Sequence, residues 1–414
     1  MTTTIKNEHK KLNVPNSTDK GNAIRNAPHL RFPEFTGEWE EATLGSVAKV
    51  VGGGTPDTNI QRYWNGNIQW FTPSEIGRDK YVTYSLRTIS EEGLNKSSAK
   101  ILPTGTILLS SRATVGECSI NNVECTTNQG FQSLIAKENI SNEFLFYLIQ
   151  TKRKELIRKS CGSTFLEISA NEVRKIKIAI PTHKEQEKIG KLLALLDERI
   201  ATQNKIIEDL KKLKSALSKL LFAQKPNGWN RLDTLFTKGK AGGTPTSTNK
   251  EYYNGEIPFL SINDITKQGK YVRYTENHLS QSGLENSSAW VVPEYSLIMS
   301  MYASVGLVTI NEVPLATSQA MFAMQLKDKS LLDYLYYYLS YFKYRHIQKY
   351  LETGTQSNIN ADIVRGILIP TYGSSHNMEI ASTLQGIDTK IDNELSVLEQ
   401  FNRQKSYFLS HMFI

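Results

Sequence analysis

The sequence predicts an α+β fold in which two pseudo-symmetric mixed α/β domains are joined by two long antiparallel coiled-coil helices. Three observations support this prediction. The chain contains one large unit twice, each copy ends in a long heptad-patterned segment, and the rest of each copy alternates between short strand and short helix patterns. Its 414 residues are enough for two or three domains with their own cores.

The duplication extends over most of the chain. The stretch GGTPDTNIQRYWNGNIQWF from Gly53 returns as GGTPTSTNKEYYNGEIPFL from Gly242, at an offset of 189 residues. After one inserted residue the match continues at an offset of 190, and Trp39 has a counterpart in Trp229. A repeat of about 185 residues is too long for a solenoid unit, so it indicates two duplicated domains.

The domain boundaries follow from the two copies. We expect a partly flexible N-terminal segment at 1–37, a first globular domain at 38–183, a central long helix at 184–225, a second globular domain at 226–375 and a C-terminal long helix at 376–414.

Both long segments carry the apolar seam of a coiled coil, in alternating steps of four and three residues. The predicted seam contains Ile189, Leu196, Ile200, Ile207, Leu210 and Leu217 in the first segment, and Ile380, Ile387, Ile391, Leu398, Phe401 and Phe408 in the second. Polar residues interrupt the two seams at corresponding places, Gln203 with Glu394 and Lys214 with Lys405. Each helix spans roughly 55 Å. We expect the two helices to pair antiparallel; the alternative is that each packs on its own domain.

Between the helices, each copy has the pattern of a compact mixed fold. The stretches 105–110, 162–168 and 173–180 are typical of short strands, and 142–149 and 332–339 of short helices. The second helix is rich in tyrosine (Tyr334, Tyr336, Tyr337, Tyr338 and, just beyond it, Tyr341). These tyrosines could stack on nucleic-acid bases, but packing against a sheet is the preferred interpretation.

The composition is that of a soluble globular protein with 39% hydrophobic residues, and the N-terminus has no apolar signal segment, so a cytoplasmic location is expected. Cys118, Cys125 and Cys161 form no CxxC pair, which favours ordinary reduced thiols over a metal site or a disulfide framework. The net charge of +8 is compatible with a polyanionic partner. Most of it lies outside the two domains, with +3 in residues 1–37 and +4 in 184–225.

The motifs of DNA-directed enzymes are missing. The chain has no Pro-Pro and hence no methyltransferase tetrapeptide of the NPPY type, no P-loop after Gly52-Gly53-Gly54-Thr55, and no H-E-x-x-H sequence. Asp209-Leu210-Lys211 resembles the end of a nuclease motif, but Leu210 is a seam position and its charged neighbours are best explained as solvated helix faces. We therefore expect no catalytic residues, no metal site and no enzymatic activity in this chain by itself.

The recurring polar loops are better explained as a binding surface. Arg, Asn, Gln, Ser and Thr side chains can form hydrogen bonds with base edges. Residues shared by both copies, such as Gly116 and Gly306 or Gln129 and Gln319, are expected to serve the fold, whereas loop residues that differ, such as Arg112 and Tyr302, are expected to discriminate between DNA sequences. The candidate DNA-binding residues are Thr55, Ser74, Arg78, Lys80, Ser111, Arg112 and Thr114 in the first copy, and Thr244, Asn263, Lys267, Lys270, Met301, Tyr302 and Ser304 in the second.

In these features the chain resembles the specificity subunits of type I restriction–modification enzymes. The resemblance rests on LRFPEFTGEW (30–39), on the GGTP blocks (53–70 and 242–259), on SSRATVGE with TTNQGF (110–131), and on GSTFLEIS (162–169) before IPTHKEQEKI (180–189). It covers nearly the whole chain from about residue 30. The second copy departs from it at 353–360 and 371–380.

The resemblance implies two target-recognition domains, each reading one half of a bipartite asymmetric target in double-stranded DNA. The helices would set the half-site spacing and dock two methyltransferase subunits, to which restriction/translocase subunits can add. The resemblance implies that this chain binds no cofactor; S-adenosylmethionine, ATP and Mg would act in the partner subunits, which carry out adenine methylation and cleavage. No membrane partner is expected.

Two other classes of protein are compatible with parts of the sequence. One is a stand-alone fused restriction–methyltransferase enzyme, which should carry a cofactor or nuclease motif. The other is a duplicated binding protein without a DNA target, such as an adhesion or carbohydrate-binding protein, which the long heptad helices disfavour. Steep weakening of DNA binding with salt would separate the DNA reader from this second class.

Overall fold

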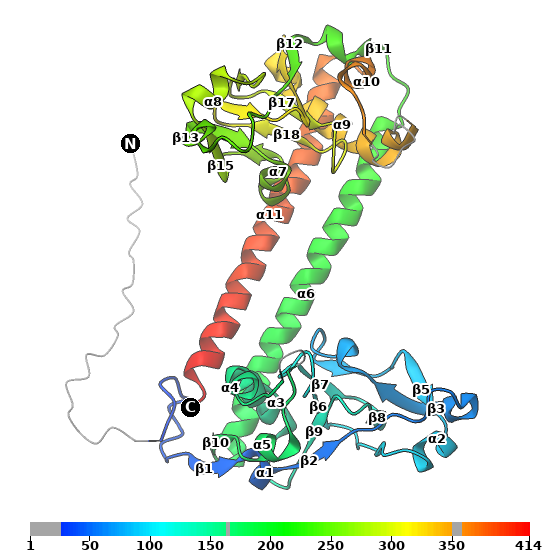
Figure 1. Cartoon of the computed structure of the whole chain (residues 1–414), viewed down its shortest axis with the longest axis vertical. Helices are drawn as coiled ribbons and strands as arrows, with labels where there is room; N and C mark the ends of the chain where they lie inside the picture. The colour runs from blue at the N-terminus through cyan, green and yellow to red at the C-terminus, as the bar shows by residue number, and fades with distance from the viewer. Residues whose placement is uncertain (1–25, 163–165, 350–357) are drawn as a thin grey trace, which may run out of the picture. The chain divides into compact units, whose positions relative to one another are not determined.

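The computed structural model describes residues 26–162, 166–349 and 358–414 (Figure 1). Two compact units are present. The first unit contains the chain up to Thr202 together with Glu399–Ile414, and the second unit contains Gln203–Leu398. Each unit therefore consists of one globular copy and parts of both long helices.

The first unit is built on a five-stranded sheet of order β2-β9-β6-β7-β4. Its strands are β2 (Ala48–Gly52), β9 (Gln132–Ala136), β6 (Ile107–Leu109), β7 (Cys118–Asn121) and β4 (Tyr81–Val82). A second sheet contains β5 (Arg87–Ile89), β3 (Trp64–Phe71) and β8 (Cys125–Thr127), and a third pairs β1 (Glu40–Thr43) with β10 (Lys177–Ile180). The strands are short because turns rich in Gly, Asn and Ser separate them.

Helix α3 (Asn142–Thr151) covers the five-stranded sheet of the first unit. It begins where the Ser141 side chain accepts a hydrogen bond from the Phe144 N–H, and Phe144 to Ile149 are all buried in the main core. The other helices are short: α1 (Leu44–Val47), η1 (Gln61–Tyr63), η2 (Pro73–Glu75), α2 (Glu91–Asn95), α4 (Arg153–Arg158) and α5 (Ala170–Arg174).

The second unit repeats this architecture. Its five-stranded sheet has the order β12-β20-β17-β18-β14, made of β12 (Phe236–Ala241), β20 (Met321–Leu326), β17 (Leu297–Ser300), β18 (Val308–Asn311) and β14 (Tyr271–Val272). Beside it lie a sheet of β15 (Asn277–Leu279), β13 (Tyr253–Leu260), β19 (Leu315–Thr317) and β16 (Val291–Val292), and the pair β11 (Gly228–Arg231) with β21 (Leu368–Thr371). The five-stranded sheets of the two units correspond strand by strand, as expected of a duplicated domain. The neighbouring sheet has β16 in the second unit, where the first unit has only an isolated bridge between Leu102 and Cys125.

The helices of the second unit are α7 (Ile262–Gln268), α8 (Gln281–Glu285), α9 (Leu332–Arg345) and α10 (Ala361–Gly366), with the short turns η3 (Leu232–Thr234), η4 (Lys250–Tyr252), η5 (Lys329–Leu331) and η6 (Ile347–Lys349). Helix α9 is the counterpart of α3. Its Tyr334, Tyr337 and Tyr338 are buried in the main core of this unit, so these tyrosines pack against the fold and are not available for stacking on bases.

The two long helices are α6 (His183–Phe222) and α11 (Ser374–His411). In the second unit Gln203 hydrogen-bonds Glu394 and Lys214 pairs with Asp388, so the numbering rises along one helix as it falls along the other. In the first unit Leu193, near the start of α6, shares a core with Met412, just after α11. Within each unit the helices thus run antiparallel and side by side (Figure 1), which confirms the predicted fold class.

All twelve predicted seam residues of α6 and α11 are buried or half-buried. The two polar interruptions of the seams are also paired, because Gln203 donates to the Glu394 carbonyl at 3.0 Å and both lysines find carboxylates on the facing helix. Polar seam positions that are satisfied in this way fix the register of a helix pair.

Two stretches differ from the predicted elements. Residues 173–180 form one strand only from Lys177; before it, Ser169 caps the short helix α5, because its side chain accepts from the Glu172 N–H. The predicted strand at 162–168 is reduced, among its described residues, to isolated bridges that join Glu167 to Cys161 and to Arg112. Residues 163–165, and residues 353–357 of the divergent segment in the second copy, lie outside the described part of the chain.

Candidate nucleic-acid interface

A small hollow lies between three loops of the first copy. Its volume is about 360 Å³, and its lining comes from three loops, at 73–74, 112–113 and 128–130. We call it the first recognition hollow; its lining residues are Pro73, Ser74, Arg112, Ala113, Asn128, Gln129 and Gly130. It brings together Ser74 and Arg112, two residues that the sequence predicted separately.

Hydrogen bonds hold the three loops in place. The Ser111 N–H donates to the Gly130 carbonyl at 2.8 Å, and the Gly130 N–H donates to the Asn128 side chain at 2.8 Å. Thr55, another candidate, donates from its hydroxyl to the Gln129 side chain. Ala113 adopts a left-handed backbone with φ of 63°, a conformation that residues other than glycine seldom adopt outside sites where the surroundings enforce it. Arg112 is therefore presented by a fixed loop.

The Gly-Gly-Thr-Pro turn serves close packing at this edge. A Cβ atom on Gly53 would lie 2.1 Å from the Asn128 carbonyl oxygen, and one on Gly54 would lie 2.2 Å from the Ser98 side chain. Neither glycine has a positive φ. The two glycines are therefore required by close packing, because the turn must approach the loop that carries Asn128 and Gln129.

Arg112 is about half-exposed and its guanidinium lies 3.8 Å from the Glu167 carboxylate. An ion pair of this length between exposed groups contributes little to stability, typically below about 1 kcal/mol. The side chain can therefore exchange this partner for another acceptor. Ser74, Arg78 and Thr114 are exposed as well, although Arg78 and Thr114 do not line the hollow.

The second copy presents different side chains on the same scaffold. The hydrogen bond from Thr244 to Gln319 repeats that from Thr55 to Gln129, and Ala303 repeats the left-handed backbone with φ of 54°. At the position of Arg112, however, stands Tyr302, which is 40% exposed. Ser304, the counterpart of Thr114, is exposed too.

The copies also differ in backbone beside this loop. The single turn η2 of the first copy is replaced by the longer helix α7, which carries Asn263 and Lys267. Both side chains are exposed and contact Glu276: Asn263 donates to its carboxylate at 3.2 Å and Lys267 forms an ion pair with it. The structure thus groups Asn263 with Lys267, as neighbours on one helix.

Two of the candidates are corrected by their burial. Ser111 has no exposed surface and Met301 is 3% exposed. Both belong to the loop that ends the central strand of the five-stranded sheet, where the direction of the side chain alternates, so Arg112 and Tyr302 point outward while their predecessors point into the domain. Ser111 and Met301 are therefore left out of the proposed contacts.

Lys80 and Lys270 are placed in the interior of two corresponding polar networks. In the first unit Lys80 pairs with Glu143 and donates at 3.0 Å to the Tyr147 hydroxyl. Tyr147 donates to Asp197 of α6 at 2.6 Å, and Asp197 receives Lys405 of α11 at 2.7 Å. One chain of polar contacts thus runs from the globular copy through both helices.

The second unit repeats this network residue by residue. Lys270 lies 2.8 Å from Asp333 and donates to Tyr337 at 3.3 Å; Tyr337 donates to Asp388 of α11 at 2.8 Å, and Asp388 pairs with Lys214 of α6. Burial, and then the Asp388 carboxylate, raise the pKa of Tyr337 far above its usual value, so its hydroxyl stays a donor. Because the Lys80 and Lys270 side chains are only 12% and 10% exposed, we treat them as positioning residues; a direct DNA contact by either stays a prediction.

Asn128 is the residue that the sequence-based selection missed. It lines the hollow, and its counterpart is Ser318, so it meets the criterion of differing between the copies. Its neighbours Thr127 and Gln129 are shared by both copies and were expected to serve the fold, so Asn128 was not among the predicted discriminating residues. Among the described residues, no group of three or more His, Cys, Asp or Glu could hold a metal ion, and no helix is long and apolar enough to cross a membrane.

The fold and the paired loops define a class: two copies of one mixed domain, each held on antiparallel helices and each displaying its own polar side chains. The model of the type I restriction modification DNA specificity domain matches the chain twice, at residues 36–212 and 226–402. The chain belongs to this family of type I restriction–modification specificity subunits, whose members are generally non-catalytic.

Individual relatives agree with this assignment. The chain is 29% identical over 327 residues to the MjaIX specificity subunit of Methanocaldococcus jannaschii, covering 73% of this chain and 75% of that protein. It is 31% identical over 188 residues to the EcoR124I/EcoR124II specificity subunit of Escherichia coli, covering 44% and 45%. Among solved structures, the S subunit from M. genitalium has a TM-score of 0.59 at 15% identity, over 94% of this chain and 99% of that one. This last likeness concerns the fold.

Proposed function

We propose that this chain is the DNA-reading subunit of a type I restriction–modification complex, in which each copy reads one half of a bipartite asymmetric target in double-stranded DNA. One observation carries the proposal: the two copies hold their loops with the same hydrogen bonds but present unlike side chains, all at least partly exposed, at equivalent positions. Arg112 stands against Tyr302, and Ser74 and Asn128 stand against Asn263 and Ser318. One scaffold with two sets of side chains is what two different half-sites require.

The chemistry of the loops favours base edges as ligands. Arginine donates two hydrogen bonds to guanine, and asparagine recognises adenine in the same bidentate way. Serine adapts to several bases, and tyrosine offers a hydroxyl and a ring. The proposed contacts are therefore Thr55, Ser74, Arg78, Arg112, Thr114 and Asn128 in the first copy, and Thr244, Asn263, Lys267, Tyr302 and Ser304 in the second.

The long helices supply spacing and docking in this proposal. With 40 residues in α6 and 38 in α11, each helix is roughly 60 Å long at about 1.5 Å per residue. Their length would set the distance between half-sites, and their outer faces would dock two methyltransferase subunits, with restriction/translocase subunits added to that complex. S-adenosylmethionine, ATP and Mg would be bound by those partners and not by this chain.

Sequencing of modified bases tests the proposal directly. The chain is expressed with the methyltransferase subunit of its own host in cells that lack other restriction systems, and methyladenine is mapped genome-wide. The expected result is one bipartite asymmetric motif. Methylation in cells that lack this chain would contradict the proposal. A continuous motif, without two half-sites separated by a gap, would contradict it as well.

The purified chain provides a second test. It should transfer no methyl group and cut no duplex by itself, and its affinity for a DNA that contains the motif should fall steeply with salt because phosphate contacts release counterions. Binding that does not change between low and moderate salt would favour a target other than DNA.

A further inference from the structure

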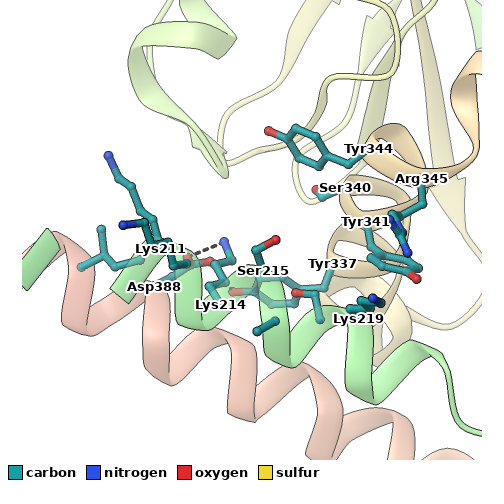
Figure 2. Close-up of a pocket in the computed structure, with 14 residues that line it drawn as sticks. Lys211, Lys214, Ser215, Lys219, Tyr337, Ser340, Tyr341, Tyr344, Arg345 and Asp388 are labelled. Atoms are coloured by element: carbon teal, nitrogen blue, oxygen red, sulfur yellow. Dashed lines mark hydrogen bonds and ion pairs between the residues drawn. The ribbon is translucent and has the colours of Figure 1, made fainter. Parts of the chain in front are cut away.

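A second hollow, larger and more basic, lies in the second unit between α6 and α9 (Figure 2). Its volume is about 640 Å³, within the range of about 300–1,000 Å³ in which proteins bury a bound group. Its walls come from residues 211–219 of α6, residues 337–345 of α9, and Asp388 and Ile391 of α11. Lys214 forms an ion pair with Asp388 in this wall. We call it the helix pocket.

Three cations surround the helix pocket without a counter-charge. Lys211, Lys219 and Arg345 line it, and none of them forms an ion pair with any residue that the structure describes. Lys214, by contrast, is engaged with Asp388. Three unpaired cations around one hollow create a positive potential that favours an anionic occupant.

Aromatic rings form much of the remaining wall. Tyr337 is buried, Tyr341 is half-buried, and Tyr344 is 80% exposed. Figure 2 shows all three tyrosines on α9, with Tyr337 beside α6 and Tyr344 farthest from it. Ala216 and Ile391 add apolar surface. An occupant therefore needs an apolar or aromatic side chain as well as negative charge.

The first copy does not carry this chemistry. At the offsets of 191 for the long helices and 190 for the domains, the counterparts of Lys211, Lys219 and Arg345 are Asn402, Ser410 and Glu155. Those of Tyr341 and Tyr344 are Thr151 and Lys154. The polar network below the pocket is duplicated, whereas the cations and the two outer rings belong to one copy alone.

We propose that the helix pocket docks an acidic segment of the partner methyltransferase, with one aromatic or large apolar side chain between the tyrosines and carboxylates against Lys211, Lys219 and Arg345. The inference rests on the proposed function. Buried aromatic anchors surrounded by charged contacts are the usual centres of protein interfaces. A nucleic-acid backbone would use the cations but leave the apolar depth of the pocket unfilled.

The consequence is that the two methyltransferase subunits are held unequally. The copy that docks beside α9 gains contacts that the copy beside α3 lacks. Assembly would then proceed through a complex with one methyltransferase, bound first at the second domain.

Exchange of the pocket cations for their counterparts tests this inference. Full-length chain with Lys211→Asn, Lys219→Ser and Arg345→Glu is titrated with the host methyltransferase by calorimetry. The native chain should bind two copies with separate affinities, and the variant should lose about tenfold from the tighter one, in line with a few rim contacts of modest strength each. The control variant, Lys225→Asn, Lys250→Ser and Lys327→Glu, changes the net charge equally at exposed lysines outside the pocket and should bind as the native chain does.

The outcomes separate the two proposals. If the native chain binds no methyltransferase, the proposed function fails. If the native chain binds two copies with equal affinity, only the inference about the pocket fails. The same holds if the pocket variant binds as the native chain does, provided that a cooperative thermal unfolding transition shows that the variant is folded.

Photo-crosslinking identifies the occupant. Benzoylphenylalanine replaces Tyr344, or Lys154 at the equivalent site of the first copy, in the complex assembled on a DNA that contains the motif. Capture of an acidic methyltransferase peptide at 344 and not at 154 supports the inference. Capture of DNA at 344, equal capture at both sites, or no capture would overturn it.

Discussion

At the scale of single residues, the molecule uses one loop twice with different side chains. Arg112 and Tyr302 occupy equivalent, outward-facing positions beside a left-handed alanine. Because the loop backbone is fixed by the fold, the side chain can change without a change in the fold. The side chains that the two copies present can therefore vary independently.

Arg112→Ala should weaken binding to the first half-site. Loss of a bidentate contact with guanine is worth about 1–3 kcal/mol of discrimination, so preference at one base pair should relax while the second half-site is unchanged. Binding of the assembled complex to a panel of single-base variants of the motif measures this. Arg231→Ala is the matched control, because Arg231 is also an exposed arginine beside a carboxylate, that of Asp233, but lies in the second copy. This variant should keep the native base preference in the first half-site. An unaltered base preference in Arg112→Ala would remove Arg112 from the interface.

The cysteines differ in reactivity for a physical reason. Burial raises the pKa of Cys118 and Cys125 to about 12, so at pH 8 almost none of either is thiolate, the reactive form. Cys161 is exposed. Iodoacetamide at pH 8 should therefore modify one cysteine of the folded chain, and peptide mass spectrometry should assign it to Cys161. Labelling of Cys118 at a similar rate would show that its strand opens readily.

Comparison of the two copies in sequence identified much of this surface, including Arg112 against Tyr302 and Ser74 against Asn263. It could not distinguish outward-facing from inward-facing positions. Ser111 and Arg112 both differ from their counterparts in the second copy, but Ser111 is buried and only Arg112 is exposed. It also could not show that Lys80 is committed to Glu143 and Tyr147, because those partners are more than sixty residues away in the chain.

At the scale of secondary-structure elements, the duplicated polar networks fix each domain to the helix pair. The network in the second unit connects Lys270, Tyr337, Asp388 and Lys214, one from each of four segments. Apolar packing alone would allow several orientations of a domain on its helices. Half-buried polar groups whose hydrogen bonds are all formed select one of these orientations.

Tyr337→Phe should destabilise the second unit. The change removes a hydrogen bond to a carboxylate without leaving a cavity, for which the expected loss is about 1.5–3 kcal/mol of unfolding free energy. Hydrogen exchange of peptides from the second unit, read at increasing urea concentration, measures it. Tyr338→Phe is an informative comparison, since Tyr338 donates to the neutral carbonyl of Leu368 at 3.0 Å and its loss should be smaller. A larger effect of Tyr338→Phe would show that the network is not a principal connection.

Lengthening both helices should change the spacer and nothing else. One heptad inserted into α6 and one into α11, at the facing positions Gln203 and Glu394, adds about 10 Å at about 1.5 Å per residue and preserves the seam. The recognised half-sites should then lie about three base pairs further apart with unchanged sequences, as read by mapping of methyladenine. A heptad in α6 alone should break the pairing of the helices and abolish modification. Altered half-site sequences in the double insertion would exclude the helices as a spacer.

Elements with strong periodicity were predicted well. The seam identified both long helices and their polar interruptions, because a repeat over many turns outweighs local ambiguity. Short elements were predicted less well: the alternation in 173–180 suggested one strand, but the cap at Ser169 starts a helix first. Local capping decides such short stretches, and alternation alone does not reveal it.

At the scale of the whole molecule, the chain does not divide at its midpoint. Residues 399–414 belong to the first unit, where Met412 and Phe413 are buried with Trp39 and Phe144. The Phe413 ring stacks on Phe144 with centroids 5.4 Å apart. Their counterparts in the second unit, Leu221 and Phe222, come from the middle of the chain.

Deletion of residues 412–414 should destabilise the first unit and spare the second. Removal of a buried aromatic side chain costs about 3–5 kcal/mol. Hydrogen exchange read peptide by peptide should show lost protection in α3 and the five-stranded sheet of the first unit, with α9 unchanged. Deletion of Ile414 alone, which is 41% exposed, is the matched control. Uniform loss of protection in both units would mean that they unfold as one.

The place of Phe413 has a consequence for biosynthesis. On the ribosome, the first domain emerges early but lacks part of its core until residues 399–414 have been translated, whereas the second domain has all of its segments by residue 398. The unit that begins first is thus completed after the second. A chain that is released before residue 399 would expose the apolar surface around Trp39 and Phe144 to chaperones and proteases, so such incomplete chains would be removed.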